Sequence, residues 1–341
     1  MERLICATPA GRTKYMRYLV PQILISEEVE KYEIWLNTRN KYDLDFFEFL
    51  EKTFPKVKLI EQPDGIVNGN KSINAFFKKA MDEDAIYVRL DDDIVWLEPA
   101  FFSKMKNARL ADKDSFLLSP LIINNSICTH LLQQEKRFEY PDYLPAYSAD
   151  ALTWEDPKFA LEIHEWFLDL LERNQEPNLR LPHDYTIALN RFSINAISWY
   201  GKVMKSFDGV VLGDDEEYMT VIKGRELGKT NKILGNVLVS HFAFYTQRAL
   251  LDSTNLLERY GQAVKMTYAD SKEINEIFKI IDSFLLTKDE EIRLNVPPPK
   301  TPLQNFICNT KHTIKNIKVP TIQFETIENI RKNIAVANEK K

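Results

Sequence analysis

The sequence lacks the features that mark several large classes of protein. Its three cysteines, Cys6, Cys128 and Cys308, form no paired framework and no CxxC spacing, so we expect free thiols rather than disulfides or a zinc site. An excess of basic residues is also missing, and the net charge of −5 argues against a dedicated nucleic-acid binder. No apolar run approaches the roughly 18 residues of a membrane span, and the first apolar run is too short for a signal peptide. We therefore expect a cytoplasmic protein.

The composition is otherwise that of an ordinary globular protein. The 341 residues are 44% hydrophobic and 28% charged, which suits one large α/β domain or two smaller ones, each with a real core. Strand-like apolar runs alternate with stretches in which apolar residues recur at helical spacing. This alternation predicts an α/β fold in which helices flank a mainly parallel, Rossmann-like sheet. The early strand-like runs are 4–8, 32–36, 57–60, 86–90 and 116–123, and a late one is 233–241.

Three consecutive carboxylates, Asp91, Asp92 and Asp93, follow the apolar strand at 86–90. Their mutual repulsion must be offset by a cation, by hydrogen bonds or by protonation. A hard divalent ion such as Mg²⁺ or Mn²⁺ takes oxygen ligands and is often shared with substrate phosphates. In a continued strand, Asp91 and Asp93 would point to the same side, which favours a metal site with Asp92 as the supporting partner. The alternative is a solvated acidic turn.

Ligands of such sheets bind beyond the carboxyl ends of the strands. Basic residues at that edge would stabilise a diphosphate leaving group together with a metal. Asn70 and Asn74 are candidates for binding ribose or sugar hydroxyls, although an asparagine at this point can equally cap a helix. For each basic residue alone, a solvated surface charge is an equal alternative; these candidates are Arg12, Arg39, Lys71 and Arg89.

A second acidic cluster runs from Gly213 to Glu217, before a predicted helix. Acids in the first turn of a helix are favoured by its dipole. The functional alternative is a general base that removes a proton from an attacking hydroxyl, with Asp215 preferred. His241 ends the late strand, either as a buried histidine bonded to backbone or as a third metal ligand beside two aspartates.

The combination resembles the GT-A glycosyltransferase superfamily, and residues 1–125 carry most of the similarity. The motifs are the DXD sequence at 91–93, the Thr8-Pro9 turn after the first strand, the helix start at 70–74, and Gly213-Asp214-Asp215-Glu216. The resemblance implies a nucleotide-sugar fold, a Mn²⁺ or Mg²⁺ ion and a UDP- or GDP-linked donor. It places Asp93 on the metal, Asp91 on ribose or metal, and His241 as a late metal ligand.

By the same resemblance, Asp215 lies where many inverting members place their base. The second motif reads Gly-Asp-Asp rather than Gly-Glu-Asp, so Asp214 and Asp215 can exchange roles. We thus expect a metal-dependent, inverting transferase that moves a sugar from a nucleotide-diphosphate donor to a hydroxyl of a glycan or glycoconjugate. The expected donor-binding residues are Thr8, Pro9, Arg12, Arg39, Asp64, Asn70, Lys71, Asn74, Arg89, Asp91 and Asp92, and the metal ligands are Asp91, Asp93 and His241.

We therefore predict three parts of the chain. They are a nucleotide-sugar-binding half at 1–125, an acceptor-binding and catalytic half of the same domain at 126–246, and a helical C-terminal extension with a tail at 247–341. The aromatic stretch 131–157 is predicted to be a long surface loop. Aromatic rings can stack on acceptor sugars, although packing is their commoner role. The candidate stacking rings are Tyr143, Tyr147, Trp154 and Trp199.

Other functions are compatible with the same acidic edge. A nucleotidyltransferase would normally have a glycine-rich basic loop after its first strand, and Ala10-Gly11-Arg12 is a poor version of one. A metal-dependent phosphoryl hydrolase and a non-catalytic nucleotide-sugar-binding protein are further alternatives. The mildly basic tail also leaves peripheral contact with an anionic membrane open, beside the simpler alternative of a solvated surface.

Overall fold

The computed structural model describes residues 2–295, excluding the side chains of Asn70 and of residues 291–295. Met1–Leu286 forms one compact unit, and Thr287–Lys341 forms a second unit whose described part continues the last helix. Cys308 and the basic tail lie outside the described residues, whereas Cys6 and Cys128 are buried free thiols, as expected. None of the helices in 2–295 combines the length and apolar composition that a membrane crossing requires.

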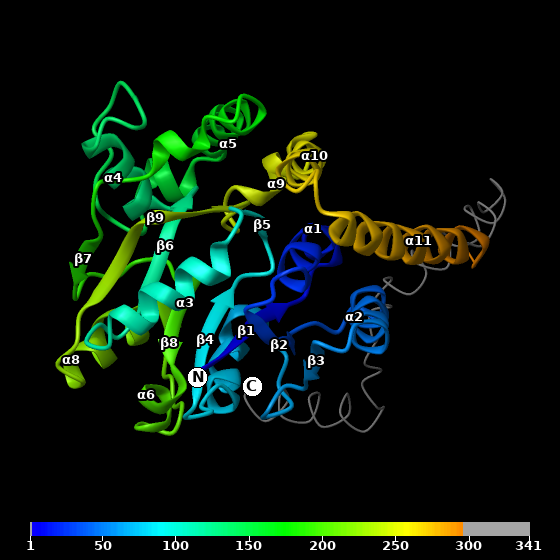
Figure 1. The fold of residues 1–341 in the computed structure, drawn as a ribbon, viewed down its shortest axis with the longest axis horizontal. Helices are drawn as coiled ribbons and strands as arrows, with labels where there is room; N and C mark the ends of the chain where they lie inside the picture. The colour runs from blue at the N-terminus through cyan, green and yellow to red at the C-terminus, as the bar shows by residue number, and fades with distance from the viewer. Residues whose placement is uncertain (1, 296–341) are drawn as a thin grey trace, which may run out of the picture. The chain divides into compact units, whose positions relative to one another are not determined.

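Within residues 2–295, nine strands form one sheet in the order β3-β2-β1-β4-β8-β6-β9-β5, and β7 pairs with β9 (Figure 1). Strands β1 to β4 pair in parallel, and β6 pairs in parallel with β9. Because β8 runs antiparallel to both β4 and β6, all six of these strands share one direction, and only β5, β7 and β8 oppose it. The strands are β1 Arg3–Ala10, β2 Val29–Leu36, β3 Val57–Ile60, β4 Ala85–Leu90, β5 Ile94–Leu97, β6 Leu118–Ile123, β7 Tyr185–Ala188, β8 Ala196–Tyr200 and β9 Asn231–His241.

The longer helices flank the sheet with an apolar face buried. In α1, for example, Met16, Leu19, Val20 and Ile23 are fully buried. The helices are α1 Thr13–Leu24, α2 Lys41–Thr53, α3 Phe101–Ala111, α4 Ser126–Gln134, α5 Pro157–Glu172, α6 Gly201–Lys205, α7 Asp215–Glu217, α8 Gly224–Glu226, α9 Arg248–Leu251, α10 Leu256–Thr267 and α11 Lys272–Asn295. Short 3-10 helices lie at η1 Gly69–Lys79 and η3 Glu176–Leu179, and π-helices at η2 Ala151–Glu155 and η4 Tyr218–Lys223.

This architecture confirms the predicted α/β fold with a mostly parallel sheet, flanking helices and a helical C-terminal part. The three-part division at 125 and 246 stays a prediction. The hydrophobic pattern was sufficient to predict the early strands, because β1 and β4 are buried on both faces and lie in the middle of the sheet.

Two local predictions around the first strand and the triplet were wrong. Thr8 and Pro9 do not form a turn, because β1 continues to Ala10; its pairing with β4 ends at Ala7, so the missing N–H of Pro9 interrupts no ladder there. The acidic triplet does not continue β4. The N–H of Ile94 bonds to the carbonyl of Asp91 at 3.1 Å, which closes a tight turn into the short strand β5.

The segment expected to start a helix at 70–74 belongs to the 3-10 helix η1. Side chains occupy backbone carbonyls at its start: the Asn37 amide donates to the Gly69 carbonyl at 2.9 Å and the Gln62 amide to the Ser72 carbonyl at 2.8 Å. These bonds compete with the regular helical pattern. The stretch 131–157 is not entirely loop either, because α4 extends to Gln134 and η2 begins at Ala151.

Candidate functional site

A cleft of about 470 Å³ opens where β1, β4 and β9 end. Its lining comes from the β1–α1 turn, the turn between β4 and β5, the segment before β8, the start of α7, and the residues that follow β9. Strands β1, β4 and β9 share one direction, so their carboxyl ends lie at the same edge of the sheet. This is the edge at which ligands of open α/β sheets bind.

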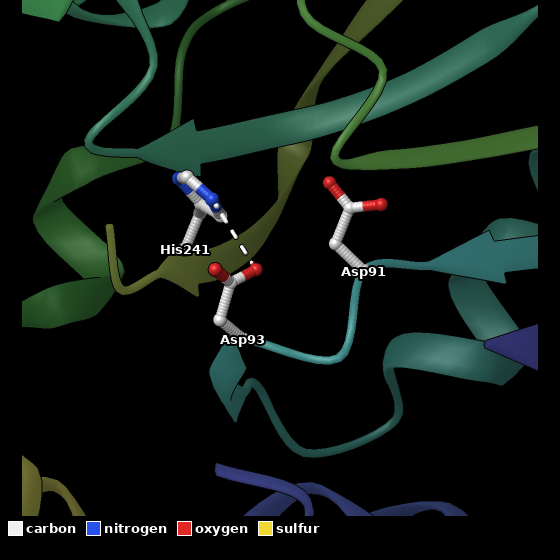
Figure 2. Close-up of side chains that lie close together, drawn as sticks. All are labelled: Asp91, Asp93 and His241. Atoms are coloured by element: carbon white, nitrogen blue, oxygen red, sulfur yellow. Dashed lines mark ion pairs between the residues drawn. The ribbon is translucent and has the colours of Figure 1, made fainter. Parts of the chain in front are cut away.

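Asp91, Asp93 and His241 meet in this cleft, from the β4–β5 turn and from the end of β9. One ligand atom of each lies within 4.8 Å of the others. Figure 2 shows the imidazole of His241 facing the Asp93 carboxylate, with the Asp91 carboxylate beside them. The pairing of Ile94 with His241 in the sheet brings the two segments together, although almost 150 residues of sequence separate them.

The hydrogen bonding of His241 leaves one ring nitrogen directed at the carboxylates. Its Nδ1 lies 3.3 Å from the carbonyl oxygen of Asn124, which can only accept, so Nδ1 carries the proton. In the neutral ring, Nε2 then presents a lone pair 3.4 Å from Oδ1 of Asp93. Two acceptors that face each other repel unless a proton or a cation lies between them. This geometry fits a divalent cation held by one imidazole nitrogen and carboxylate oxygens. Such a donor set suits Mn²⁺, whereas Mg²⁺ would use the carboxylate oxygens.

Arginines surround the same carboxylates. Arg12 and Arg248 each place a guanidinium nitrogen 3.1 Å from Oδ2 of Asp93, and Arg89 contacts Asp91 at 2.7 Å. Burial would raise the pKa of Asp93, but the guanidinium groups of Arg12 and Arg248 hold that pKa well below its usual range. Burial raises the pKa of Asp91 to about 6, although Arg89 opposes this shift.

Asp92 supports the site rather than joining the ligand group. Its carboxylate accepts the backbone N–H of Gly11 at 2.9 Å and the Nε–H of Arg12 at 3.0 Å. Asp92 therefore ties the β4–β5 turn to the β1–α1 turn. Gly11 itself packs closely, because a Cβ there would lie 3.3 Å from the Asn37 carbonyl oxygen.

The second acidic cluster lines the same cleft, and Arg191 lies among its carboxylates. The guanidinium of Arg191 is 3.1 Å from Asp214 and 2.9 Å from Glu216. Asp214 is the N-cap of α7, since its carboxylate accepts the N–H of Glu217 at 2.8 Å. Burial raises the pKa of Asp215, and it raises that of Glu216 to about 7 against the opposing effect of Arg191.

Most of the predicted site residues reach the cleft. Its lining includes Pro9, Arg12, Arg89, Asp91, Asp92, Asp93, Asp214, Asp215 and His241. Thr8 lies fully buried within β1, while Arg39, Asp64 and Lys71 are exposed outside the cleft. Asn74 donates to the Gly213 carbonyl at 3.0 Å and so holds the loop before α7 instead of lining the cleft. The side chain of Asn70 lies outside the described part.

Of the four aromatic residues predicted to stack on sugars, the structure brings only Trp154 to the cleft. Trp199 is fully buried in the sheet, stacked on Tyr87 at 5.6 Å, and its indole N–H donates to the Ala80 carbonyl. Its predicted stacking role is therefore wrong, because the strand pattern around it buries both faces of β8. Tyr143 and Tyr147 are exposed but do not line the cleft.

Several lining residues were missed by sequence reasoning. Arg191, Asn195 and Arg248 are isolated polar residues in loops or at a helix start, and their partners are distant in sequence. Phe244 and Tyr245 follow His241 closely, and that proximity was the one available signal for them. Glu216 was visible in the acidic cluster, but nothing local distinguished it from Glu217.

The sequence matches no family model and no curated protein. Solved structures with a similar fold include glucosyl-3-phosphoglycerate synthase from Mycobacterium tuberculosis in complex with Mn²⁺, UDP and glucosyl-3-phosphoglycerate, with 9% identity, a TM-score of 0.43, and coverage of 78% of this chain and 80% of that one. Another is a 4-diphosphocytidyl-2C-methyl-D-erythritol synthase, with 9% identity, a TM-score of 0.41, and coverage of 76% and 100%. A third is CMP:2-keto-3-deoxy-manno-octonic acid synthetase complexed with CTP, with 9% identity, a TM-score of 0.41, and coverage of 75% and 98%. The function of this chain therefore has to be argued from its own site.

Proposed function

We propose that this protein is a metal-dependent glycosyltransferase that moves a sugar from a nucleotide-diphosphate donor to an acceptor hydroxyl with inversion. The observation that carries the proposal is the Asp91–Asp93–His241 group, in which the lone pair of His241 Nε2 faces Asp93 in a cleft lined with arginines. A bound Mn²⁺ or Mg²⁺ ion would supply charge stabilisation for the departing diphosphate.

The donor diphosphate would lie between the metal group and the β1–α1 turn. Arg12 and Arg248 pair with Asp93, and both are about 30% exposed at their side chains. They can therefore turn toward phosphate oxygens without a large desolvation cost. Arg89 is buried and bonded to the Ile194 carbonyl and Asp91, so it acts as a fixed positive charge behind the ligand group.

Asp215 is the proposed general base. Transfer forms a bond between the acceptor oxygen and the anomeric carbon, breaks the bond from that carbon to the phosphate oxygen, and sends the acceptor proton to the base. Asp214 is committed to capping α7 and pairing with Arg191. Asp215 lies in the cleft, and the hydrogen bond that its carboxylate makes within the described part of the chain is a local one to the N–H of Glu216. This leaves lone pairs for a substrate proton.

The first test is thermal unfolding with UDP, GDP, CDP and ADP, each with and without Mn²⁺. A ligand at 100 times its dissociation constant stabilises the folded state by about 2.7 kcal/mol, so the donor nucleotide should raise the melting temperature only when the metal is present. Asp93→Ala should abolish that metal-dependent shift. If no nucleoside diphosphate stabilises the wild-type protein, the proposed donor site is wrong. If only a nucleoside triphosphate stabilises the protein, and turnover of that triphosphate releases pyrophosphate, the protein is a nucleotidyltransferase instead.

A further inference from the structure

Three aromatic rings form a corner of the cleft that the proposed donor site does not use. Trp154 lies with its ring centre 5.9 Å from that of Phe244 and 5.3 Å from that of Tyr245. Phe244 is buried, whereas Tyr245 is 66% exposed and Trp154 is partly exposed, and all three line the cleft. The corner thus presents an apolar surface to a cleft whose other walls are largely charged.

Hydrogen bonds fix this corner before any ligand arrives. Trp154 belongs to the π-helix η2, whose N-cap Asp150 accepts the N–H groups of Leu152 at 3.0 Å and Thr153 at 2.9 Å. From the segment after β9, the Thr246 hydroxyl donates to the Trp154 carbonyl at 2.8 Å. Single-turn π-helices are frequent at functional sites, and a backbone held in this way reduces the conformational entropy that Trp154 loses on binding.

The corner lies on the β9 side of the metal group. The rings of Phe244 and His241 are 4.7 Å apart, so the aromatic surface adjoins the ligand group from the β9 side. The loops that follow β1 and β2 line the cleft at Gly11 and Asn37. In the order of the sheet, β8 and β6 lie between β9 and the group formed by β1, β2 and β4. A nucleotide bound over β1 and β2 would therefore leave the aromatic corner free.

Polar groups suited to sugar hydroxyls share the cleft with the corner. Asp215, Glu216 and Arg191 offer planar carboxylate and guanidinium groups, which can engage neighbouring hydroxyls in pairs. A pyranose has one face of C–H groups and a rim of hydroxyls, so it needs an apolar platform beside polar groups. The aromatic corner provides the apolar platform, and Asp215, Glu216 and Arg191 provide the polar groups in the same cleft.

We infer that Trp154 and Tyr245 form a stacking subsite for a sugar ring of the acceptor, which orients its hydroxyl toward Asp215. This inference rests on the proposed function and names its acceptor class. The aromatic corner then binds a carbohydrate rather than the nucleobase of the donor.

The test is saturation-transfer NMR with methyl glycosides of glucose, galactose, mannose and rhamnose, in the presence of the stabilising nucleotide and of Mg²⁺, which unlike Mn²⁺ is diamagnetic. At least one glycoside should bind, with the strongest saturation on the C–H protons of one ring face. Trp154→Ala should raise its dissociation constant about tenfold, whereas Trp154→Phe should retain most of the affinity. Tyr147→Ala removes an exposed aromatic ring that does not line the cleft, and it should change nothing.

Two results would overturn the inference. One is the absence of saturation with every glycoside, or a dissociation constant that Trp154→Ala leaves unchanged. The other is loss of the metal-dependent nucleotide shift in a Trp154→Ala protein that still unfolds cooperatively, since the corner would then hold the nucleobase. A wild-type protein that binds glycosides but no nucleotide would contradict the proposed function alone, so the two failures are distinguishable.

Discussion

At the scale of single residues, Asp214 and Asp215 differ in the bonds that hold them. Asp214 caps α7, so we expect Asp214→Ala to lower the free energy of unfolding by about 1 kcal/mol and to leave turnover largely intact. Asp215→Asn removes the proposed base, and it should reduce turnover roughly 100-fold or more while stability and nucleotide binding stay unchanged. Chemical denaturation and release of nucleoside diphosphate from the nucleotide sugar measure the two effects. Full turnover in Asp215→Asn would transfer the base role to another residue, with Glu216 the first to examine.

At the scale of elements, the ends of β6 and β9 are joined through Asn124. Its carbonyl accepts His241 Nδ1, and its amide donates to the Phe242 carbonyl at 3.0 Å and to Gln247 at 2.9 Å. Asn124 is fully buried and adopts a φ of 60°, a left-handed conformation that asparagine and glycine tolerate best. The residue that fixes the tautomer of His241 is therefore itself held by the two bonds of its side-chain amide.

Asn124→Gly should keep this backbone conformation and lose the amide bonds, so the backbone that orients His241 becomes less constrained. Loss of such an outer-shell contact typically weakens metal binding by about 10- to 100-fold, and titration with Mn²⁺ followed by electron paramagnetic resonance measures the change. Asn174→Gly is a matched control, because Asn174 also has a positive φ, at 54°, but is exposed and does not line the cleft. Equal Mn²⁺ affinity in both variants would mean that Asn124 does not position the ligand.

The same elements explain what sequence patterns can and cannot predict here. Buried runs such as 86–90 identify strands because both faces of β4 are covered, and three adjacent aspartates after such a run indicate a site. The turn at 91–93 was named only as the alternative to a continued strand, because it depends on pairing between β5 and β9. Arg191 and Arg248 have no local signature, since a solitary arginine in a loop acquires its role only from contacts with Glu216 and Asp93, which the fold supplies.

At the scale of the whole molecule, a buried polar chain links the sheet to helices α5 and α10. The Ser240 hydroxyl lies 2.8 Å from the Tyr260 hydroxyl, which is 2.7 Å from His164 Nδ1, and His164 Nε2 lies 2.7 Å from the Phe242 carbonyl. Because that carbonyl can only accept, Nε2 is the donor and Nδ1 accepts from tyrosine. His164 is fully buried and neutral, so folding of the entire unit depends on keeping it uncharged.

This arrangement predicts how stability depends on pH. Burial lowers the pKa of His164 to about 3, although its bond to Phe242 opposes the shift, and an unfolded histidine has a pKa of about 6.5. Between these values the unfolded chain binds a proton that the folded protein does not, so the free energy of unfolding falls as the pH falls, by up to about 1.4 kcal/mol per pH unit. His164→Gln can preserve both hydrogen bonds without titrating. Denaturation curves from about pH 7 to about pH 5 should therefore show wild type losing stability faster than His164→Gln, whereas parallel losses would mean that His164 is protonated in the folded protein or that its cavity opens to water.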